Sequence, residues 1–422
     1  MDYEAQAFDL MQLFYDETGF NDHQMHCCVE LEGAVDEQRL ERAMGLCLEA
    51  VPILATRFVR DKGGYRWTSL APEALGPAFA AAPDRAAFEL ERTCRIDERV
   101  GPQVRLAWLG GGRPRLAFTM NHMVSDAAGF KDFLYLFCET YRSIGRDESF
   151  RPGRLIDGDR GLRPVLARTG KVARALALLG RGGRNNRAGE TTFPFEGGPG
   201  EERPFIATRT IGRERTAELK TYCKERGATV NDAALAAYFR ALSYAFKEAG
   251  MPARDIELPV MVDMRRYLPD RDFRSLRNLT STVLVRARDS GGGFERTLLE
   301  TKAGMDALKD RGIGLGGFVK LDLLFSSLGQ VEAARRLRGG LRNPRICMTN
   351  IGEIDSSRLA FDGARVGSVY ICGAIKHKPH FQVAVSGFDG TLTLSSNLYG
   401  TAADRAQVEA FLASVEKELV AR

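Results

Sequence analysis

The amino-acid sequence predicts an α/β protein made of two packed α/β sandwich halves. Apolar runs typical of strands alternate with amphipathic stretches typical of helices through most of the 422 residues, as in mixed α/β layers. The alternation stops at 151–204, where Gly, Pro and Arg replace periodic apolar residues, as they do in linkers. We therefore expect a first half at 1–150, a basic linker at 151–204 and a second half at 205–422.

Each expected element follows from its hydrophobic period, which is two residues for a strand and about 3.6 for a helix. In the first half we expect strands at 26–31, 103–109 and 115–120, and helices at 36–50 and 127–144. In the second half we expect helices at 213–226, 230–248, 294–310 and 402–420, and strands at 256–262, 280–287 and in the segments ICMTN, VGSVYIC, FQVAVSG and TLTLSSN.

Composition excludes several classes of protein. Hydrophobic residues make up 44% of the chain and charged residues 27%, which is ordinary for a globular protein and unlike a disordered one. No apolar run approaches the roughly 18 residues of a membrane span, and the acidic start MDYEAQAFDL is not a signal peptide. The eight cysteines have no CxxC or zinc-like spacing. We expect a soluble, cytoplasmic protein with reduced, mostly buried cysteines.

Two glycine- and histidine-containing patterns are poor candidates for sites. Gly312, Gly314 and Gly317 spell GxGxxG, but they follow an expected helix rather than a strand, so we interpret them as a flexible helix-to-helix turn. His377 and His380 lack HExxH spacing, and Pro379 interrupts any helix between them. We therefore predict no metal site.

The most informative segment is 116–130, LAFTMNHMVSDAAGF. Its pattern predicts a strand, a tight turn and a helix, with His122 and Asp126 at the junction. A histidine there can take a proton near neutral pH from a hydroxyl or amine that attacks a carbonyl. The aspartate can orient the imidazole, or brace the turn through an arginine elsewhere. The structural alternative is a packed histidine beside an aspartate that caps the helix.

This segment resembles the HHxxxDG signature of the superfamily that contains chloramphenicol acetyltransferase, the condensation domains of nonribosomal peptide synthetases, polyketide-associated acyltransferases and wax ester synthases. Two further segments match in the same order. TVNDAALAA, 229–237, resembles the TVNDVVLAA stretch of the wax ester synthase and polyketide-associated branches, and TNIG, 349–352, resembles their SNxxG stretch. The three matches span more than half the chain.

The resemblance implies two chloramphenicol acetyltransferase-like halves, joined by a crossover segment, with the active site in a channel between them. It implies that His122 is the general base, and we predict His122 and Asp126 together as the catalytic residues. The chain departs from the signature at Asn121, which replaces the first histidine, and at Ala127, which replaces the glycine after the aspartate. Asn121 keeps a hydrogen-bonding side chain, and Gly129 follows two places later; we count both as support for the motif.

Further candidates come from the second half. The strand in PVMVDMRRY ends near Arg265, and the superfamily implies an arginine there as the partner of Asp126, which would hold the turn in shape. The alternative is an arginine that faces solvent. Thr349 and Asn350 are candidates to donate hydrogen bonds to an oxyanion, with Ser281 and Thr282 as rivals.

The linker is the most charge-biased region, with ten Lys or Arg residues and two Asp between positions 151 and 187. The stretch 165–179 mixes Arg168, Lys171 and Arg174 with apolar residues, which predicts a short basic amphipathic helix. Three interpretations stay open: a solvated face, a docking site for a phosphate-bearing donor or an acidic acyl carrier protein, and a peripheral membrane contact. Nucleic-acid binding is not expected, because no motif accompanies the charge.

The predicted activity is acyl transfer from a thioester to a small-molecule alcohol or amine, with no bound cofactor. The co-substrate would be acyl-CoA or a phosphopantetheinyl carrier protein. One alternative is a stand-alone condensation-type enzyme that forms an amide from carrier-bound substrates. The other is a catalytically degenerate relative that binds acyl chains or a partner.

Overall fold

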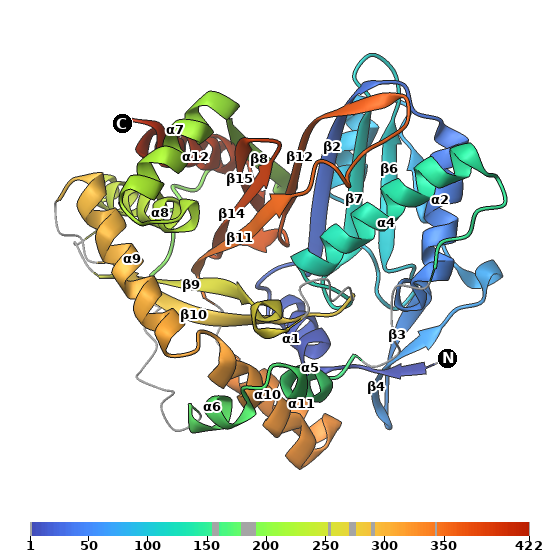
Figure 1. The fold of residues 1–422 in the computed structure, drawn as a ribbon, viewed down its shortest axis with the longest axis horizontal. Coiled ribbons are helices and arrows are strands. Elements are labelled where there is room, and N and C mark those ends of the chain that lie inside the picture. Colours follow the sequence, from blue (N-terminus) through green and yellow to red (C-terminus); the bar gives the residue numbers. More distant parts are fainter. Residues whose placement is uncertain are drawn as a thin grey trace.

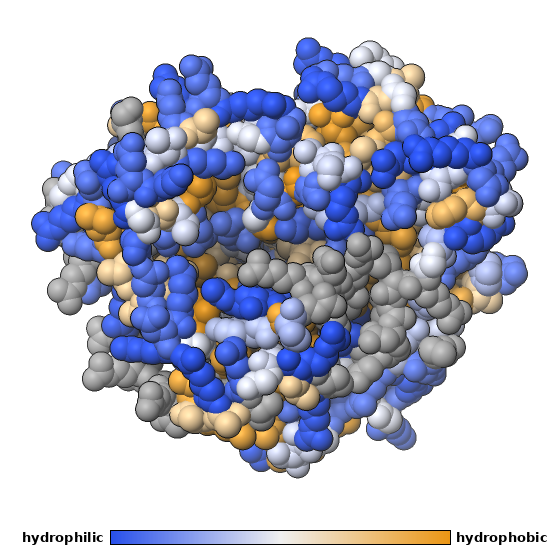
Figure 2. All heavy atoms as spheres, in the orientation of Figure 1, coloured by the Kyte–Doolittle hydropathy of each residue, from blue (hydrophilic) through white to orange (hydrophobic). Residues whose placement is uncertain are grey.

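Two mixed α/β lobes lie side by side in the computed structural model (Figure 1). It describes residues 2–153, 160–178, 191–251, 255–269, 276–287, 292–341 and 344–421. Hydrophilic residues cover most of the face shown in Figure 2, and hydrophobic residues appear there in scattered patches. Within the described ranges, no helix is both long enough and apolar enough to cross a membrane.

The first lobe is built on a sheet with the strand order β12-β2-β7-β6-β5. Alternate side chains serve opposite faces of this sheet: Cys27 and Phe118 belong to the large core, whereas their neighbours Cys28 and Ala117 pack with Phe88 of α3. Helix α4 packs against α2, and both contribute to the large core. The strands and helices are β2 (Gln24–Gly33), β5 (Phe79–Ala81), β6 (Val104–Leu109), β7 (Arg115–Asn121), β12 (Ala364–Cys372), α2 (Glu37–Ala50), α3 (Arg85–Arg92) and α4 (Ala127–Arg146).

The second lobe is built on a sheet with the order β10-β9-β11-β14-β15-β13, in which β15 also pairs with β8. Helix α8 packs against α9 and α12, and its alanine-rich face is buried in the core of this lobe. The strands are β8 (Arg203–Ile211), β9 (Ile256–Asp263), β10 (Thr280–Ala287), β11 (Ile346–Ile354), β13 (Lys376–His377), β14 (Phe381–Phe388) and β15 (Thr391–Gly400). The helices are α7 (Arg213–Glu225), α8 (Val230–Glu248), α9 (Phe294–Asp310) and α12 (Ala402–Val420).

Strand β12 ties the lobes together. It lies within the predicted second half, yet it pairs antiparallel with β2 along eight register positions, from Ala364 opposite Gly33 to Cys372 opposite His26. The chain therefore returns to the first lobe after β11, and Figure 1 shows β12 at the edge of that lobe. The division of the chain at residues 150 and 204 stays a prediction. The strands of 205–422 do not all belong to one sheet, because β12 belongs to the sheet of the first lobe.

A small sheet and several helices were not expected from the sequence. Strands β1 (Asp2–Glu4), β4 (Gly64–Ser69) and β3 (Thr56–Asp61) form the sheet, and α1 (Ala7–Glu17) follows β1. Helices α10 (Leu315–Leu328) and α11 (Gln330–Gly340) lie below both lobes in Figure 1. The GxGxxG glycines are partly a turn as expected: Gly312 and Gly314 have φ of +81° and +80° between α9 and α10, but Gly317 lies inside α10.

The prediction of one basic helix at 165–179 is wrong. The structure has two short helices there, α5 (Leu162–Arg168) and α6 (Val172–Ala177). The Thr169 hydroxyl donates to the Leu166 carbonyl, and Gly170 then adopts φ +62°, a conformation that ends a helix. Residue 179 lies outside the described residues, as do four of the ten basic residues counted between 151 and 187, namely Arg154, Arg181, Arg184 and Arg187.

Candidate active site

His122 lies in the turn between β7 and α4, where the lobes meet. Its backbone N donates to the His23 carbonyl at 2.8 Å, which holds the turn against the start of β2. From the second lobe, the Asn278 amide donates to the His122 carbonyl at 2.8 Å and to the Met123 carbonyl at 3.2 Å. Hydrogen bonds from both lobes to the backbone of this turn therefore fix the position of the residue that carries the imidazole.

The geometry of the imidazole defines its proton state. Nδ1 lies 2.8 Å from the Ser125 carbonyl oxygen, and a carbonyl only accepts hydrogen bonds. In the neutral ring Nδ1 therefore carries the hydrogen, and Nε2 keeps its lone pair. Among the described residues, Nε2 has no hydrogen-bond partner. Burial lowers the pKa of His122, although the Ser125 carbonyl and the charge of Asp126 oppose this effect.

Asp126 supports the turn and does not contact the imidazole through a hydrogen bond. It is the N-cap of α4: Oδ1 accepts from the Gly129 backbone N at 3.0 Å. Its Oδ2 accepts from the Leu279 backbone N at 2.7 Å and from Arg265 Nη1 at 2.7 Å. Asp126 has two candidate roles, which are to orient the imidazole or to brace the turn. These hydrogen bonds favour the bracing role over a catalytic role beside His122.

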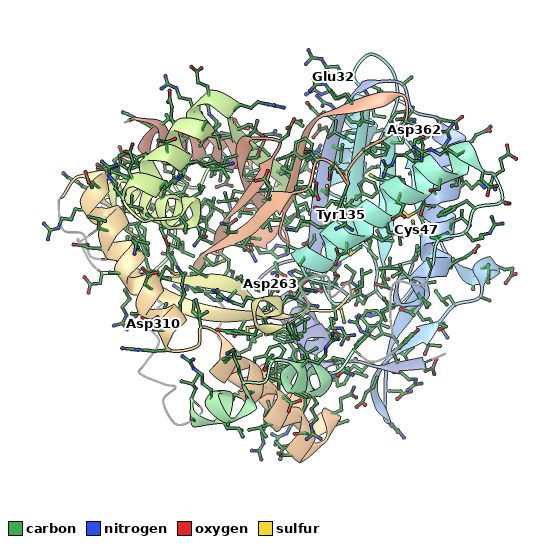
Figure 3. All side chains as sticks on the ribbon, in the orientation of Figure 1. Glu32, Cys47, Tyr135, Asp263, Asp310 and Asp362 are labelled. Atoms are coloured by element: carbon green, nitrogen blue, oxygen red, sulfur yellow. The ribbon has the colours of Figure 1, made fainter. Side chains whose placement is uncertain are left out.

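Arg265 reaches Asp126 from a short 3-10 helix, Met264–Tyr267, that follows β9. Both side chains are buried, at 9% and 1% exposure. Burial acts to raise the pKa of Asp126, but the charge and hydrogen bonds of Arg265 outweigh it and hold that pKa below the usual value. Figure 3 shows the neighbouring Asp263 at the centre of the molecule, close to the first turn of α4.

The two departures from the signature are accommodated without strain. Asn121 is fully buried, its amide donates to Gln103 Oε1 at 2.7 Å, and its carbonyl oxygen accepts from the Met123 backbone N at 2.8 Å. Ala127 is the first helical residue of α4 and does not have positive φ, so a glycine is not required at this position. Both sequence changes are compatible with an intact turn.

Sequence reasoning missed the buried polar residues that surround the turn. Arg160, at 4% exposure, donates to the Val124 and Met123 carbonyls at 2.9 and 3.3 Å and to Asp9 Oδ1 at 3.0 Å. Asn278 lies two positions before β10, the strand that carries the candidates Ser281 and Thr282. Arg160 lies in a Gly- and Arg-rich stretch that is typical of a linker, so no local sequence pattern indicated that its side chain supports the turn.

Lys131 connects α4 to the second lobe. Its ammonium donates to the carbonyls of Ile351 and Glu353 on β11, at 3.0 and 3.1 Å. Further along α4, the Tyr135 hydroxyl accepts from the Asp355 backbone N at 2.8 Å. These contacts join the helix that carries the His122 turn to the strand that carries the TNIG segment.

The four oxyanion candidates differ in what their side chains already bond. The Ser281 hydroxyl donates to the Gly314 carbonyl at 2.8 Å, and the exposed Thr282 hydroxyl lies 3.3 Å from Met261 Sδ. Exposed Asn350 donates to Asn231 Oδ1 at 2.9 Å and accepts from the Gly352 backbone N at 2.8 Å. Thr349 is half-buried on β11, and its hydroxyl has no hydrogen-bond partner within the described part of the chain.

The bond between Asn350 and Asn231 joins two of the sequence motifs, TVND and TNIG. The basic candidates lie elsewhere, on α5, on α6 and in the turn between them, beside α10. Arg168 is exposed and Lys171 is half-buried, while exposed Arg174 donates to the Asp310 carbonyl.

Across the described ranges, no group of three or more His, Cys, Asp or Glu side chains is placed to hold a metal ion.

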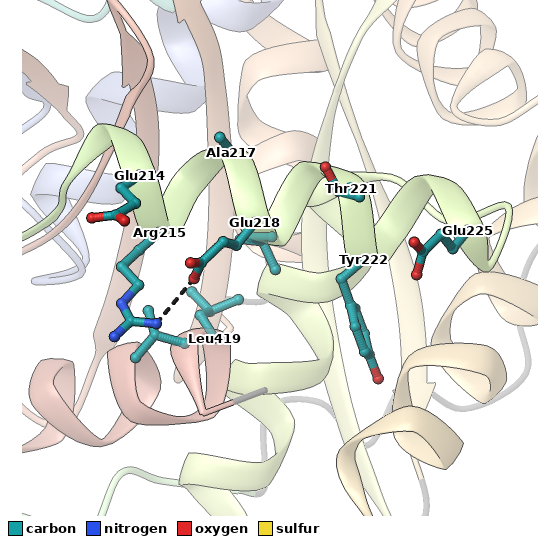
Figure 4. Close-up of a pocket in the computed structure, with 10 residues that line it drawn as sticks. Glu214, Arg215, Ala217, Glu218, Thr221, Tyr222, Glu225 and Leu419 are labelled. Atoms are coloured by element: carbon teal, nitrogen blue, oxygen red, sulfur yellow. Dashed lines mark hydrogen bonds and ion pairs between the residues drawn. The ribbon is translucent and has the colours of Figure 1, made fainter.

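A surface pocket on the second lobe contains none of the predicted site residues. It lies along α7 and the end of α12, as Figure 4 shows. Its rim includes an ion pair between Arg215 and Glu218, at 3.0 Å. The pocket has no counterpart to the His122 geometry, so it does not compete as an active site.

Comparison with known proteins identifies the fold. No protein-family model and no curated protein sequence matches the chain, whereas many solved structures do. Polyketide synthase associated protein 5 from Mycobacterium tuberculosis aligns over 99% of this chain and 99% of its own, with a TM-score of 0.69 and 15% identity. The chain therefore shares its fold with this structure over nearly its whole length, and the predicted fold class is confirmed.

Two other structures show how widely this fold is used. The first condensation domain of the CDA synthetase aligns over 100% of this chain and 96% of its own, with a TM-score of 0.70 and 18% identity. Trichothecene 15-O-acetyltransferase from Fusarium sporotrichioides aligns over 100% and 95%, with a TM-score of 0.70 and 13% identity. At these identities the comparisons establish the fold.

Proposed function

We propose that the protein transfers an acyl group from a thioester to an alcohol or amine, with His122 as the general base. The observation that carries this proposal is the hydrogen bond from Nδ1 to the Ser125 carbonyl, because it leaves Nε2 as a proton acceptor. A base placed in this way contributes roughly 100 to 10,000-fold in rate. The lowered pKa keeps the ring neutral, and so ready to accept, at neutral pH.

The proposed reaction is a direct displacement. Nε2 takes the proton of the acceptor as its oxygen or nitrogen forms a bond to the thioester carbonyl carbon. The carbon–sulfur bond then breaks, and the imidazolium returns the proton to the leaving thiolate. We assign oxyanion stabilisation to Thr349, because its hydroxyl bonds to none of the described residues, whereas Ser281 and Asn350 already donate elsewhere.

Asp126 and Arg265 are positioning residues in this mechanism. The carboxylate caps α4 and accepts from the Leu279 backbone N, and the guanidinium fixes it from the second lobe. The turn therefore keeps its shape only when the lobes are docked. A displacement of the imidazole by about 1 Å can cost on the order of 100-fold in rate.

The donor we propose is acyl-CoA or an acylated phosphopantetheinyl carrier protein. The names of the structural neighbours support both: one is an acetyltransferase, and others are condensation domains of synthetases. Exposed Arg168 and Arg174, with Lys171, form the basic surface that we assign to docking of a phosphate-bearing donor or an acidic carrier. The second candidate function, amide formation between carrier-bound substrates, is favoured by the condensation-domain neighbours.

A donor and acceptor panel tests the proposal. We would measure thiol release from short to long acyl-CoAs with pooled alcohols and amines, and identify the products by mass. Acceptor-dependent release establishes an acyltransferase that uses CoA. Release from acylated carrier proteins, but from no CoA thioester, establishes the condensation-type alternative. If the protein binds acyl chains without an acceptor and releases thiol from neither donor, both proposed activities are contradicted. The protein would then be a catalytically degenerate relative that binds acyl chains.

A further inference from the structure

The segment 20–24 connects the His122 turn to strand β13. On one side, Gln24 pairs with Asn121, and the His23 carbonyl accepts from the His122 backbone N. On the other side, Asn21 forms a bridge with Lys376, and the His377 backbone N donates to the Phe20 carbonyl at 3.3 Å. Lys376 is therefore separated from the catalytic turn by a single segment of backbone.

Lys376 has a buried side chain, and burial lowers the pKa of its ammonium. Its side chain is only 3% exposed, and it lies 3.9 Å from the centroid of the Phe20 ring. Among the described residues, no carboxylate or carbonyl accepts a hydrogen bond from Nζ. Asp22 acts on it electrostatically, but the Asp22 Oδ1 atom accepts instead from the backbone N atoms of Gln24 and Ile375, at 3.2 and 2.9 Å.

An ammonium in this position is costly unless something accepts its hydrogen bonds. It has three donors, and an unsatisfied buried charge is strongly destabilising. The buried Arg160 and Arg265 show how this protein normally meets that requirement, since each bonds a buried carboxylate. Lys376 also differs from Lys131, which donates to two carbonyls. The missing partner points to a ligand.

Lys376 is close to both parts of the proposed site. Burial is the main cause of the lowered pKa of His122, and the charge of Lys376 adds to it. The same charge also reaches the Cys347 thiol on β11. Because alternate residues of a strand share a face, Cys347 and Thr349 lie on the same side of β11. The ammonium is therefore within electrostatic range of both the general base and the strand that carries the assigned oxyanion donor.

We propose that Lys376 binds a carboxylate of the acceptor substrate, so that the preferred acceptors are hydroxy acids or amino acids. This inference rests on the proposed acyl transfer. A carboxylate on a small acceptor can reach Lys376 while its hydroxyl or amine lies at His122. The phosphates of a CoA donor cannot fill the same place, because the pantetheine arm separates them from the thioester that must meet the acceptor.

The test compares each acid with its neutral ester. We would measure acyl transfer to hydroxy and amino acids and to their methyl esters, with the wild type, Lys376→Met, Lys376→Arg and the exposed control Lys320→Met. We expect the wild type to prefer the acids, and Lys376→Met to raise KM for the acids about tenfold or more, with a much smaller loss of kcat/KM for the esters. Lys376→Arg should keep most of the preference, and Lys320→Met all of it.

Two results would overturn the assignment: a wild type that treats acids and esters alike, or a Lys376→Met variant that is impaired equally on both. Titration calorimetry with the same acids and esters separates this inference from the proposed function. Acid binding that Lys376→Met removes would uphold the anion site even if no acyl transfer occurs. Absence of selective acid binding to the wild type would overturn it, whatever the transfer assay shows.

Discussion

Arg265 Nη1 donates to Asp126 Oδ2 at 2.7 Å across 139 positions of the chain. The aspartate begins α4 in the first lobe, and the arginine follows β9 in the second. Because both groups are buried, water cannot replace either partner. The pair therefore links the shape of the His122 turn to the docking of the two lobes.

Removing one member of this pair should destabilise the protein strongly. Arg265→Met leaves the Asp126 carboxylate buried without its cation, and such a change costs about 3–5 kcal/mol. The free energy of unfolding from urea titration measures it. Arg296→Met is the matched control, because Arg296 and Glu300 form an exposed pair at 60% and 39% exposure, worth about 0.5 kcal/mol or less. Equal losses in the two variants would show that the buried pair has no special role.

Asn121 should matter for the structure of the turn rather than for chemistry. Asn121→Ala leaves Gln103 Oε1 and the Met123 backbone N without their partners, which costs about 1–3 kcal/mol. We expect a lower thermal midpoint and an activity loss much smaller than that caused by removing His122. An Asn121→Ala variant as inactive as a His122 variant, yet as stable as the wild type, would give Asn121 a catalytic role.

The rate should depend on pH through His122. Burial lowers the pKa of this histidine from its ordinary value of about 6.5. The imidazole is therefore neutral, and able to act as a base, at any pH above this lowered pKa. The value of kcat/KM should rise with pH through that lowered pKa and be level near neutral pH. The pH–rate profile of the wild type measures this limb. A limb centred above about 6.5 would contradict a neutral, buried base.

Charge on α5 and α6 should control the use of an acidic donor. Reversing Arg168, Lys171 and Arg174 to Glu should raise KM for an acylated carrier protein at low salt, and added salt should shrink the difference. Reversal of Lys220 and Lys224, which are exposed on α7, is the control and should leave KM nearly unchanged. If both sets give the same KM at low salt, this surface is a solvated face and not a docking site.

Much of the fold follows from local sequence patterns. The long periodic segments become α4, α8, α9 and α12 with ends within about two residues of those expected, because a continuous apolar stripe defines a helix well. The strand-to-helix junction at His122 also follows from such a pattern. The pairing of β12 with β2 does not, since its register is set by contacts more than 300 positions apart, which no window of sequence contains.

The candidate site divides in the same way. His122 is visible in the sequence because its turn resembles a known signature. Arg160 and Asn278 are not visible, because they act by donating to backbone carbonyls of that turn, and any segment that passes close enough can supply such donors. Lys376 carries no sequence signal either, because its burial arises only when β13 meets Asn21.

The most direct test of the central claim is the rate of acyl transfer by His122→Ala and the wild type, measured with the donor and acceptor that the panel identifies. Circular dichroism and the unfolding midpoint would establish that the variant is folded. We predict a loss of about 100 to 10,000-fold in kcat/KM, with part of the rate restored by added imidazole. A folded variant that transfers acyl groups at the wild-type rate would contradict the assignment of His122 as the base.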